Sequence, residues 1–378
     1  MTDAAIAEET PPQGSVQNRS LWATALLRLK RNRAAVASFF VLIFLIIAGG
    51  LGPMVSPHSY SEVYPEFVKT RPSLSPYPQA EQIIPAAESA LRRARVEVGE
   101  IVIEDGTVRI AVSSESEIDP RISRYVDRSD VFSNAEVVDI SGDGLSGAIT
   151  ADVQQLYFLM GTDANGRDLF SRTLIALRIS LMIGALATAV ALVIGVIYGA
   201  TSGFVGGRVD NLMMRFVDIM DSLPFVFFVI LLVVFFGSNL VLMFIAIGAT
   251  QWLDMSRIVR GQTLSLRRRE FVQAAESLGV SSWDIVKRHI IPNTLGNVMV
   301  YMTLLIPKVI LLESFLSFLG LGVQEPLTSL GVLIAEGAKN MRNAPSMLFY
   351  PAATMTVLLF ALNFLGDGLR DALDPKDR

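Results

Sequence analysis

Long apolar runs separated by shorter polar segments dominate the chain. A helix that crosses a bilayer core requires about 20 consecutive, mostly apolar residues. Runs of this kind lie at residues 34–55, 176–200, 215–236, 239–256, 296–318 and 346–366. They predict six transmembrane helices and therefore an all-α polytopic membrane protein. The composition points the same way, since 51% hydrophobic and 18% charged residues lie outside the balance of soluble proteins.

The positions of the basic residues predict the orientation in the membrane. Four basic residues precede the first run, namely Arg28, Lys30, Arg31 and Arg33. That run is long for a signal peptide and lacks a small-residue cleavage site, so we predict a retained helix. The connection after the fourth run is also basic, with Arg257, Arg260, Arg267, Arg268, Arg269, Lys287 and Arg288. Because basic loops stay inside, both termini are predicted to be cytoplasmic.

The two predicted tails are residues 1–33 and 367–378. Residues 1–20 are polar, contain prolines and show no periodicity, so we predict that they are disordered.

Residues 56–159, between the first two runs, have the character of a soluble domain. The segment is first rich in proline and then predicts a helix at about 80–95. Two alternating strands flank Asp105-Gly106, a dipeptide that favours a tight hairpin turn, and a third strand is predicted near 135–140. We expect a small inserted α+β extracytoplasmic domain, a solvated cap without chemistry of its own.

A polar, basic segment at residues 270–293 separates two apolar runs. Phe271 to Leu278 predicts a short helix, and Gly279 can adopt the left-handed conformation that ends it. Ser281 and Asp284 have the spacing of a capping box for a second helix. These features predict a cytoplasmic helical hairpin.

The end and the surface of this hairpin can also be predicted. Pro292 is expected to end the second helix. Ala274 and Ala275 are small enough for another surface to approach closely. The hairpin is therefore predicted to dock onto a partner.

The order of residues in the hairpin resembles the cytoplasmic signature of ABC importer permeases. That signature has Glu-Ala-Ala, a glycine four residues later, and a proline after two aliphatic residues. Here Gln273 replaces the acidic residue, and Glu270 or Glu276 could supply its charge. In the family the hairpin couples to the ATP-hydrolysing subunit. The implied coupling residues are Gln273, Ala274, Ala275, Glu276, Gly279 and Pro292.

Further motifs narrow the resemblance to the second permease subunit of dipeptide and oligopeptide importers, within the peptide/nickel family. They are GTDANGRD at 161–168, GGRVDNLMMRFVDIMDSLP at 206–224, ESFLSFLGLG at 313–322 and GDGLRDALDP at 366–375. Leu330 stands where the family often has Trp. The resemblance implies a permease core over residues 160–366, with five transmembrane helices, in a bacterial inner membrane.

The resemblance also implies partners. They are a homologous second permease, two ATPase subunits or domains, an extracytoplasmic peptide-binding protein and the lipid bilayer, without nucleic acid. The chain contains no GxxxxGK[ST] phosphate-binding loop, so ATP and Mg²⁺ are expected on separate chains and no enzyme activity here. Without cysteine, and with only two histidines, thiolate and histidine-cluster metal sites are excluded.

The GTDANGRD segment predicts a helix at the membrane interface. Thr162 or Asp163 would cap it, and Asp168 and Arg172 would lie one turn apart. We expect this helix to be structural.

Two charged residues lie in the fifth apolar run and are candidates for the translocation path. Lys308 and Glu313 differ by about 140° of rotation and about 7.5 Å of rise on a helix, so they are poorly placed to pair with each other. Glu313 is expected to be structural or to line the path. Lys308 either lines a water-filled path or is neutralised by a carboxylate of the partner permease.

Two other functional classes remain open. An ion-coupled secondary transporter would show buried carboxylates in several helices and an internal repeat. A membrane-tethered extracytoplasmic enzyme would need a catalytic group in residues 56–159, where only His58 accompanies scattered acids. The cargo is equally open among dipeptides, longer peptides, cell-wall peptides, opines and nickel complexes.

Overall fold

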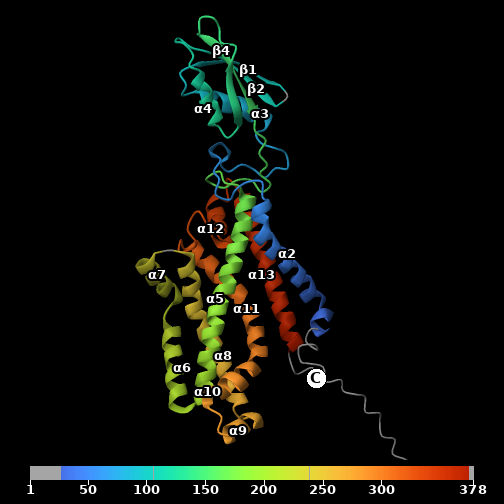
Figure 1. Cartoon of the computed structure of the whole chain (residues 1–378), viewed down its shortest axis with the longest axis vertical. Coiled ribbons are helices and arrows are strands. Elements are labelled where there is room, and N and C mark those ends of the chain that lie inside the picture. Colours follow the sequence, from blue (N-terminus) through green and yellow to red (C-terminus); the bar gives the residue numbers. More distant parts are fainter. Residues whose placement is uncertain (1–26, 105, 238, 374–378) are drawn as a thin grey trace, which may run out of the picture.

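The computed structural model describes residues 27–104, 106–237 and 239–373. Residues 1–20, for which we predicted disorder, and residues 374–378 of the predicted C-terminal tail lie outside these ranges. Long helices form a bundle, a domain with a β-sheet stands beyond one end of it, and a short helical hairpin lies at the opposite end (Figure 1).

Eight helices build the bundle within the described ranges. They are α2 (Arg33–Val55), α5 (Leu169–Val205), α6 (Gly207–Ser222), α7 (Phe225–Phe236), α8 (Leu240–Leu266), α11 (Ile291–Phe318), α12 (Leu330–Asn340) and α13 (Ser346–Leu373). By length and apolarity, four could each cross a membrane: α2, α5, α13 and α11 with the turns before it, from Ser282. The bent pair α6 and α7 would make a fifth.

The span predicted at 215–236 is not one continuous helix, because it is divided between α6 and α7. The chain turns by 80° between α6 and α7. Leu223 has φ −78° and ψ 128°, which is extended, because Pro224 disfavours helical conformation in the residue before it. Helix α8 falls short of the apolarity of a typical span because Gln251, Asp254 and Arg257 lie within it.

The helix predicted to end at 366 continues as α13 to Leu373, so most of the predicted C-terminal tail is helical. Gly368 lies against the start of α2, where an added Cβ would be 2.4 Å from the Cβ of Ala35. This packing between α13 and α2 holds the last turns of α13 in the bundle.

Helices α5 and α8 form the most extensive helix pair of the bundle, and they meet along glycines. An added Cβ on Gly195 would lie 2.6 Å from the Cβ of Met255. On Gly199 it would lie 2.3 Å from the carbonyl oxygen of Ser256. Gly203 continues the row at the same four-residue spacing, which places all three on one helix face. Small residues at this spacing let two helix backbones approach closely.

The segment between α2 and α5 contains a four-stranded antiparallel sheet in the order β1-β2-β4-β3. The strands are β1 (Glu97–Glu104), β2 (Thr107–Ser113), β3 (Phe132–Val138) and β4 (Ser146–Val153). The helical elements around it are η1 (Pro65–Phe67), α3 (Ala80–Leu91), η2 (Pro120–Ile122) and α4 (Ser123–Asp127). Its core includes the fully buried Leu91, Val126 and Phe132 together with inward residues of β2 and β4.

Strand β4 was absent from the sequence prediction, although a signal for it exists. Asp143-Gly144 is a second Asp-Gly pair, and it joins β3 to β4 as the first such pair joins β1 to β2. Asp143 accepts a hydrogen bond from the backbone N–H of Leu145 at 3.0 Å, and Gly144 has φ +72°.

The close contacts of the three α5 glycines predict that adding even one methyl group there lowers the stability of the protein. Gly199→Ala should lower the stability of the protein by about 1–3 kcal/mol, because the added methyl meets backbone that cannot move aside. Gly296→Ala is the matched control, since an added Cβ there meets nothing within 4 Å and alanine favours the helix by up to about 1 kcal/mol. Thermal unfolding in detergent should show opposite shifts for the two variants, and equal shifts would contradict this account of the α5–α8 contact.

Candidate functional site

The hairpin at 270–293 forms as a pair of short helices, α9 (Glu270–Ser277) and α10 (Ser282–Ile285). Helix α9 ends in a Schellman motif, in which Val280 N–H donates to the carbonyl of Ala275 at 3.1 Å and Gly279 N–H donates to that of Glu276 at 3.0 Å. Gly279 has φ +76°, as the sequence predicts. An added Cβ there would meet nothing within 4 Å, so only the backbone conformation requires glycine.

The second half of the hairpin differs from the prediction. Ser281 caps α10 as expected, because its Oγ accepts from Asp284 N–H at 3.2 Å. Pro292, however, does not end the helix. A π-helical stretch, η3 (Val286–Ile290), joins α10 to α11, and the widened turn accommodates a proline that lacks an N–H and would clash with a regular turn.

The two alanines of the signature face opposite ways. Ala275 is 6% exposed and packs near the fully buried Val272, so its side chain faces the interior of this chain and its role in docking stays a prediction. Ala274, Gln273 and Glu276 are exposed. They remain available to a partner.

Large apolar side chains also protrude from the hairpin, and sequence reasoning overlooked them. Leu278 is 83% exposed and Trp283 is 55% exposed, with Phe271 and Val280 less so. Apolar residues at a polar turn are the signal that could have revealed them, since a large exposed apolar patch marks an interaction site. We call Phe271, Leu278, Val280 and Trp283 the hairpin knob. It lies at the end of the bundle away from the sheet (Figure 1).

At the opposite end of the bundle, Asp163 organises the GTDANGRD segment. Its side chain is 1% exposed. Oδ1 accepts from the backbone N–H groups of Asn165 at 2.8 Å and Arg167 at 2.9 Å. Oδ2 accepts from Arg167 Nε at 2.8 Å and from Arg172 Nη1, and Arg172 also pairs with Glu336 of α12 at 3.0 Å.

This arrangement corrects three details of the sequence prediction. Asp168, rather than Thr162 or Asp163, caps the helix, because its Oδ2 accepts from Ser171 N–H at 2.9 Å. No separate interfacial helix forms here, since α5 begins at Leu169 and continues for 37 residues. Arg172 pairs with Asp163 instead of its neighbour on the helix, so the motif is a structural anchor.

Lys308 pairs within its own chain, an outcome that the sequence alternatives did not include. Its Nζ lies 2.9 Å from Oδ2 of Asp254 on α8. Asp254 is 3.7 Å from Arg257, which in turn is 3.2 Å from Asp218 and 3.0 Å from Asp221 on α6. These five residues, which we call the charge ladder, connect α11, α8 and α6 and have side chains 36–60% exposed.

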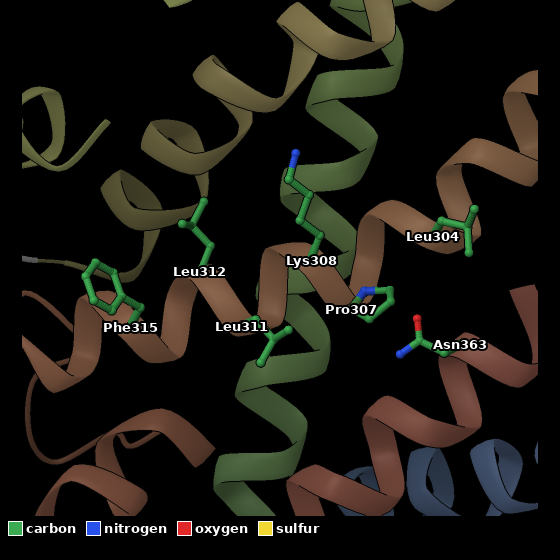
Figure 2. Close-up of a pocket in the computed structure, with 7 residues that line it drawn as sticks. All are labelled: Leu304, Pro307, Lys308, Leu311, Leu312, Phe315 and Asn363. Atoms are coloured by element: carbon green, nitrogen blue, oxygen red, sulfur yellow. The ribbon is translucent and has the colours of Figure 1, made fainter. Parts of the chain in front are cut away.

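Lys308 also lines a groove on the bundle with six other residues. They are Leu304, Pro307, Leu311, Leu312, Phe315 and Asn363. Figure 2 shows Lys308 and Leu312 leaving α11 on the same side, whereas Asn363 comes from α13. Lys308 is therefore the one charged residue among the lining of an open groove whose other residues, apart from Asn363, are apolar.

The buried environment of Glu313 favours the structural one of its two predicted roles. This residue is 1% exposed and lies among hydroxyl groups. Its Oε1 accepts from Ser317 Oγ at 2.7 Å and Ser329 Oγ at 2.6 Å. Ser329 caps α12 and Ser180, 3.5 Å from Glu313, belongs to α5. Glu313 thus joins α11, α12 and α5.

His58 is equally structural. Its Nδ1 lies 3.0 Å from the hydroxyl of Tyr64 and its Nε2 lies 3.1 Å from the carbonyl of Tyr157. With both ring nitrogens engaged and the ring buried, His58 gives no support to an enzyme site. In the described residues, no group of three or more His, Asp or Glu side chains could hold a metal ion.

Comparison with known proteins matches both parts of the chain. Residues 191–378 match the binding-protein-dependent transport system inner membrane component family. Residues 20–76 match the N-terminal transmembrane domain of oligopeptide transport permease C. A chain of the MetNI methionine ABC transporter, in an inward-facing crystal form, covers 55% of this chain with a TM-score of 0.43 and 16% identity.

Two relatives match over nearly the full length of the chain, and a third matches over part of it. The oligopeptide transport system permease protein OppC of Escherichia coli K12 is 44% identical over 96% of this chain and 94% of its own length. The dipeptide transport system permease protein DppC of Bacillus subtilis is 34% identical over 98% of this chain and 91% of its own. OppC of Salmonella typhimurium reaches 61% over 58% of this chain and 72% of its own.

The hairpin, the GTDANGRD anchor and the relatives that match over nearly the full length all indicate the same family. The chain belongs to the oligopeptide and dipeptide permease family of binding-protein-dependent ABC transport systems.

Proposed function

We propose that this chain is one of two permease subunits that together form the path of an ATP-driven peptide importer. The hairpin knob carries the proposal. Burying a Leu or Trp side chain removes apolar area from water and stabilises an interface by about 1.5–3 kcal/mol per residue. A hairpin that exposes two of them, at the end of helices that traverse the bundle, is built for a protein partner.

That partner is a separate ATPase subunit in our proposal. Gln273 and Glu276 surround the knob with polar groups, and Lys287 and Arg288 add positive charge on η3. An apolar centre with a polar rim is the usual composition of a protein interface. ATP and Mg²⁺ would bind to the ATPase, and this chain would supply the lever.

The remaining topology follows from this assignment. The knob and both termini face the cytoplasm of a bacterial cell, six membrane crossings include the bent α6–α7 pair and α8, and the sheet domain lies outside. The names of the relatives support peptides over nickel or opines as cargo. An extracytoplasmic binding protein would deliver the peptide to the outer side.

The charge ladder supports the position of the path. Charged groups in membrane helices are costly in lipid and usually face protein or water. The ladder is half-exposed in the isolated chain, so its face must be covered by the second permease or open to water in a membrane. We place it along the path, where it can keep the route hydrated.

The first prediction from this proposal tests the hairpin knob. Leu278→Ser and Trp283→Ala should each weaken ATPase binding by about tenfold to a hundredfold, since each removes a buried apolar contact. Membrane insertion should be normal, because both residues are exposed in this chain. Co-purification of the ATPase and peptide uptake would be measured together.

Gly279→Val should reach the same result by a different route. Valine is disfavoured at φ +76°, so the backbone at residue 279 should rearrange and change the direction of α10. A steric clash would not be the cause, because an added Cβ at Gly279 meets nothing within 4 Å. Leu145→Ser, an exposed position in the sheet domain, is the control and should behave as wild type. Wild-type uptake in all hairpin variants would mean that the hairpin is a passive connector.

The second prediction tests the path. Lys308→Met should reduce uptake per assembled complex while stability changes by less than about 1 kcal/mol, because a half-exposed ion pair contributes little. Lys339→Met, an exposed cation on α12, should leave uptake unchanged. Loss of assembly in Lys308→Met would indicate an interface role instead, and unchanged uptake would remove Lys308 from the path.

The third prediction concerns the sheet domain. Tyr77 and Leu156 exchange two backbone hydrogen bonds, of 2.7 and 2.8 Å, so the two ends of the domain meet. Residues 78–155 can therefore be replaced by a short glycine linker without disturbing the Asp163 anchor. If the domain guides docking, the shortened transporter should assemble normally but take up peptide poorly.

Cross-linkers at Arg92 and Arg128 should, in the intact transporter, capture the binding protein or the second permease. Capture of neither, together with full uptake by the shortened transporter, would rule out a docking role.

A further inference from the structure

A basic groove lies where the sheet domain joins the bundle. It is formed by the segment Lys69–Pro72, which begins in a turn, and by the corner between α12 and α13, from Arg342 to Tyr350. The lining residues include three cations, Lys69, Arg71 and Arg342, and no acidic residue. Because the two walls are far apart in sequence, only the fold brings the three cations together.

The three cations are available to a ligand. None of them forms an ion pair with a carboxylate of the described ranges. Glu66 borders an adjoining pocket, but its Oε2 accepts from Ser129 Oγ at 2.7 Å. Helix α13 has no acidic residue in its first turn, so its positive end also remains uncompensated by a side chain.

The level of the groove can be derived from the packing of α5. Helix α2 ends at Val55, and the Oγ of the next residue, Ser56, lies 2.5 Å from Ser171 Oγ on α5. Leu169 packs in one cluster with Ala344 and Met347 of the groove corner. Two residues of helix correspond to about 3 Å, so the groove opens at the level where the apolar membrane zone ends.

Apolar side chains accompany the cations at this level. Phe349 lines the groove and is 66% exposed, and Tyr350 lies beside it. Leu74 and Met341, next to the two walls in sequence, are 87% and 54% exposed. Aromatic residues at the ends of membrane helices mark the level of the lipid headgroups. A free anion would leave this apolar surface in water, whereas an acyl chain would cover it.

We propose that this groove binds the phosphate headgroup of an anionic phospholipid, with the acyl chains descending past Phe349 along α13. Lys69 and Arg71 hold the phosphate from the sheet-domain side, and Arg342 holds it from the bundle side. A bound lipid would thereby join the two walls of the groove. The site is separate from the charge ladder and the hairpin knob, and it does not depend on the identity of the cargo.

The test uses the assembled transporter in phosphatidylcholine bilayers. Phosphatidylglycerol and phosphatidylcholine, spin-labelled on the acyl chain, report by electron paramagnetic resonance how much lipid the protein immobilises. We expect a preference for phosphatidylglycerol of about fivefold or more, the factor that one basic residue near an anionic surface contributes. The variant K69Q/R71Q/R342Q should lose that preference.

The matched control is R92Q/R93Q/R128Q, which removes the same charge from exposed positions of the sheet domain and should keep the preference. Arg71→Gln and Arg342→Gln, one on each wall, should each lose part of it, which guards against misfolding of the triple variant. Excess glycerol phosphate should not compete, since it offers no acyl chain.

Three results would overturn the proposal. The first is an unchanged preference in the triple variant, and the second is an equal loss in the control. The third is displacement by glycerol phosphate, which would identify a site for a free anion. If the first result comes with loss of binding-protein docking in the same variant, the groove is assigned to that protein instead. Peptide uptake is not a readout here, so the outcome is independent of the proposed transport function.

Discussion

The close contact between α5 and α8 is the constraint on which the rest of the structure depends. Gly199 brings the α5 backbone so near to Ser256 that no side chain fits between them. Interhelical distance is therefore set by backbone contact instead of by deformable side chains. Helices held in this way behave as one rigid unit, because packed interiors transmit displacement and absorb little of it.

This rigid unit joins the two ends of the molecule. At the end near the sheet domain, Asp163 and Arg172 attach the start of α5 to α12 and to the base of that domain. At the hairpin end, α8 leads into α9, and Arg260 binds Asp210 of α6 with two hydrogen bonds of 2.6 Å. A force on the hairpin knob would reach the bent α6–α7 pair and the charge ladder through these contacts. In our proposal the hairpin acts as a lever on the membrane helices, and a lever transmits a displacement only if the unit behind it is stiff.

The polar groups of the bundle fall into two kinds according to exposure. Glu313 and Asp163 are buried and fully surrounded by donors, so they fix the packing of helices. Asp254 and Lys308 are half-exposed on a surface that a membrane would otherwise cover. Buried groups of the first kind are complete within one chain, and those of the second kind require water or a partner. The surface that carries Asp254 and Lys308 is therefore incomplete in the isolated chain.

The sequence by itself determined what depends on local chemistry. Apolar runs identified most of the long helices, Asp-Gly marked a hairpin, and Gly279 and Ser281 marked the end and start of short helices, because caps and turns are decided within a few residues. Signature spacing identified the family for the same reason.

Tertiary structure decided everything that depends on neighbours distant in sequence. The 80° bend before Pro224, the continuation of α10 through Pro292, the burial of Ala275 and the pairing of Lys308 with Asp254 were each missed or predicted differently. A proline restricts the backbone locally, but the surrounding helices determine whether it bends, ends or is accommodated. Likewise, the partner of a charge 54 residues away is set by the packing of α8 against α11, which no local pattern encodes.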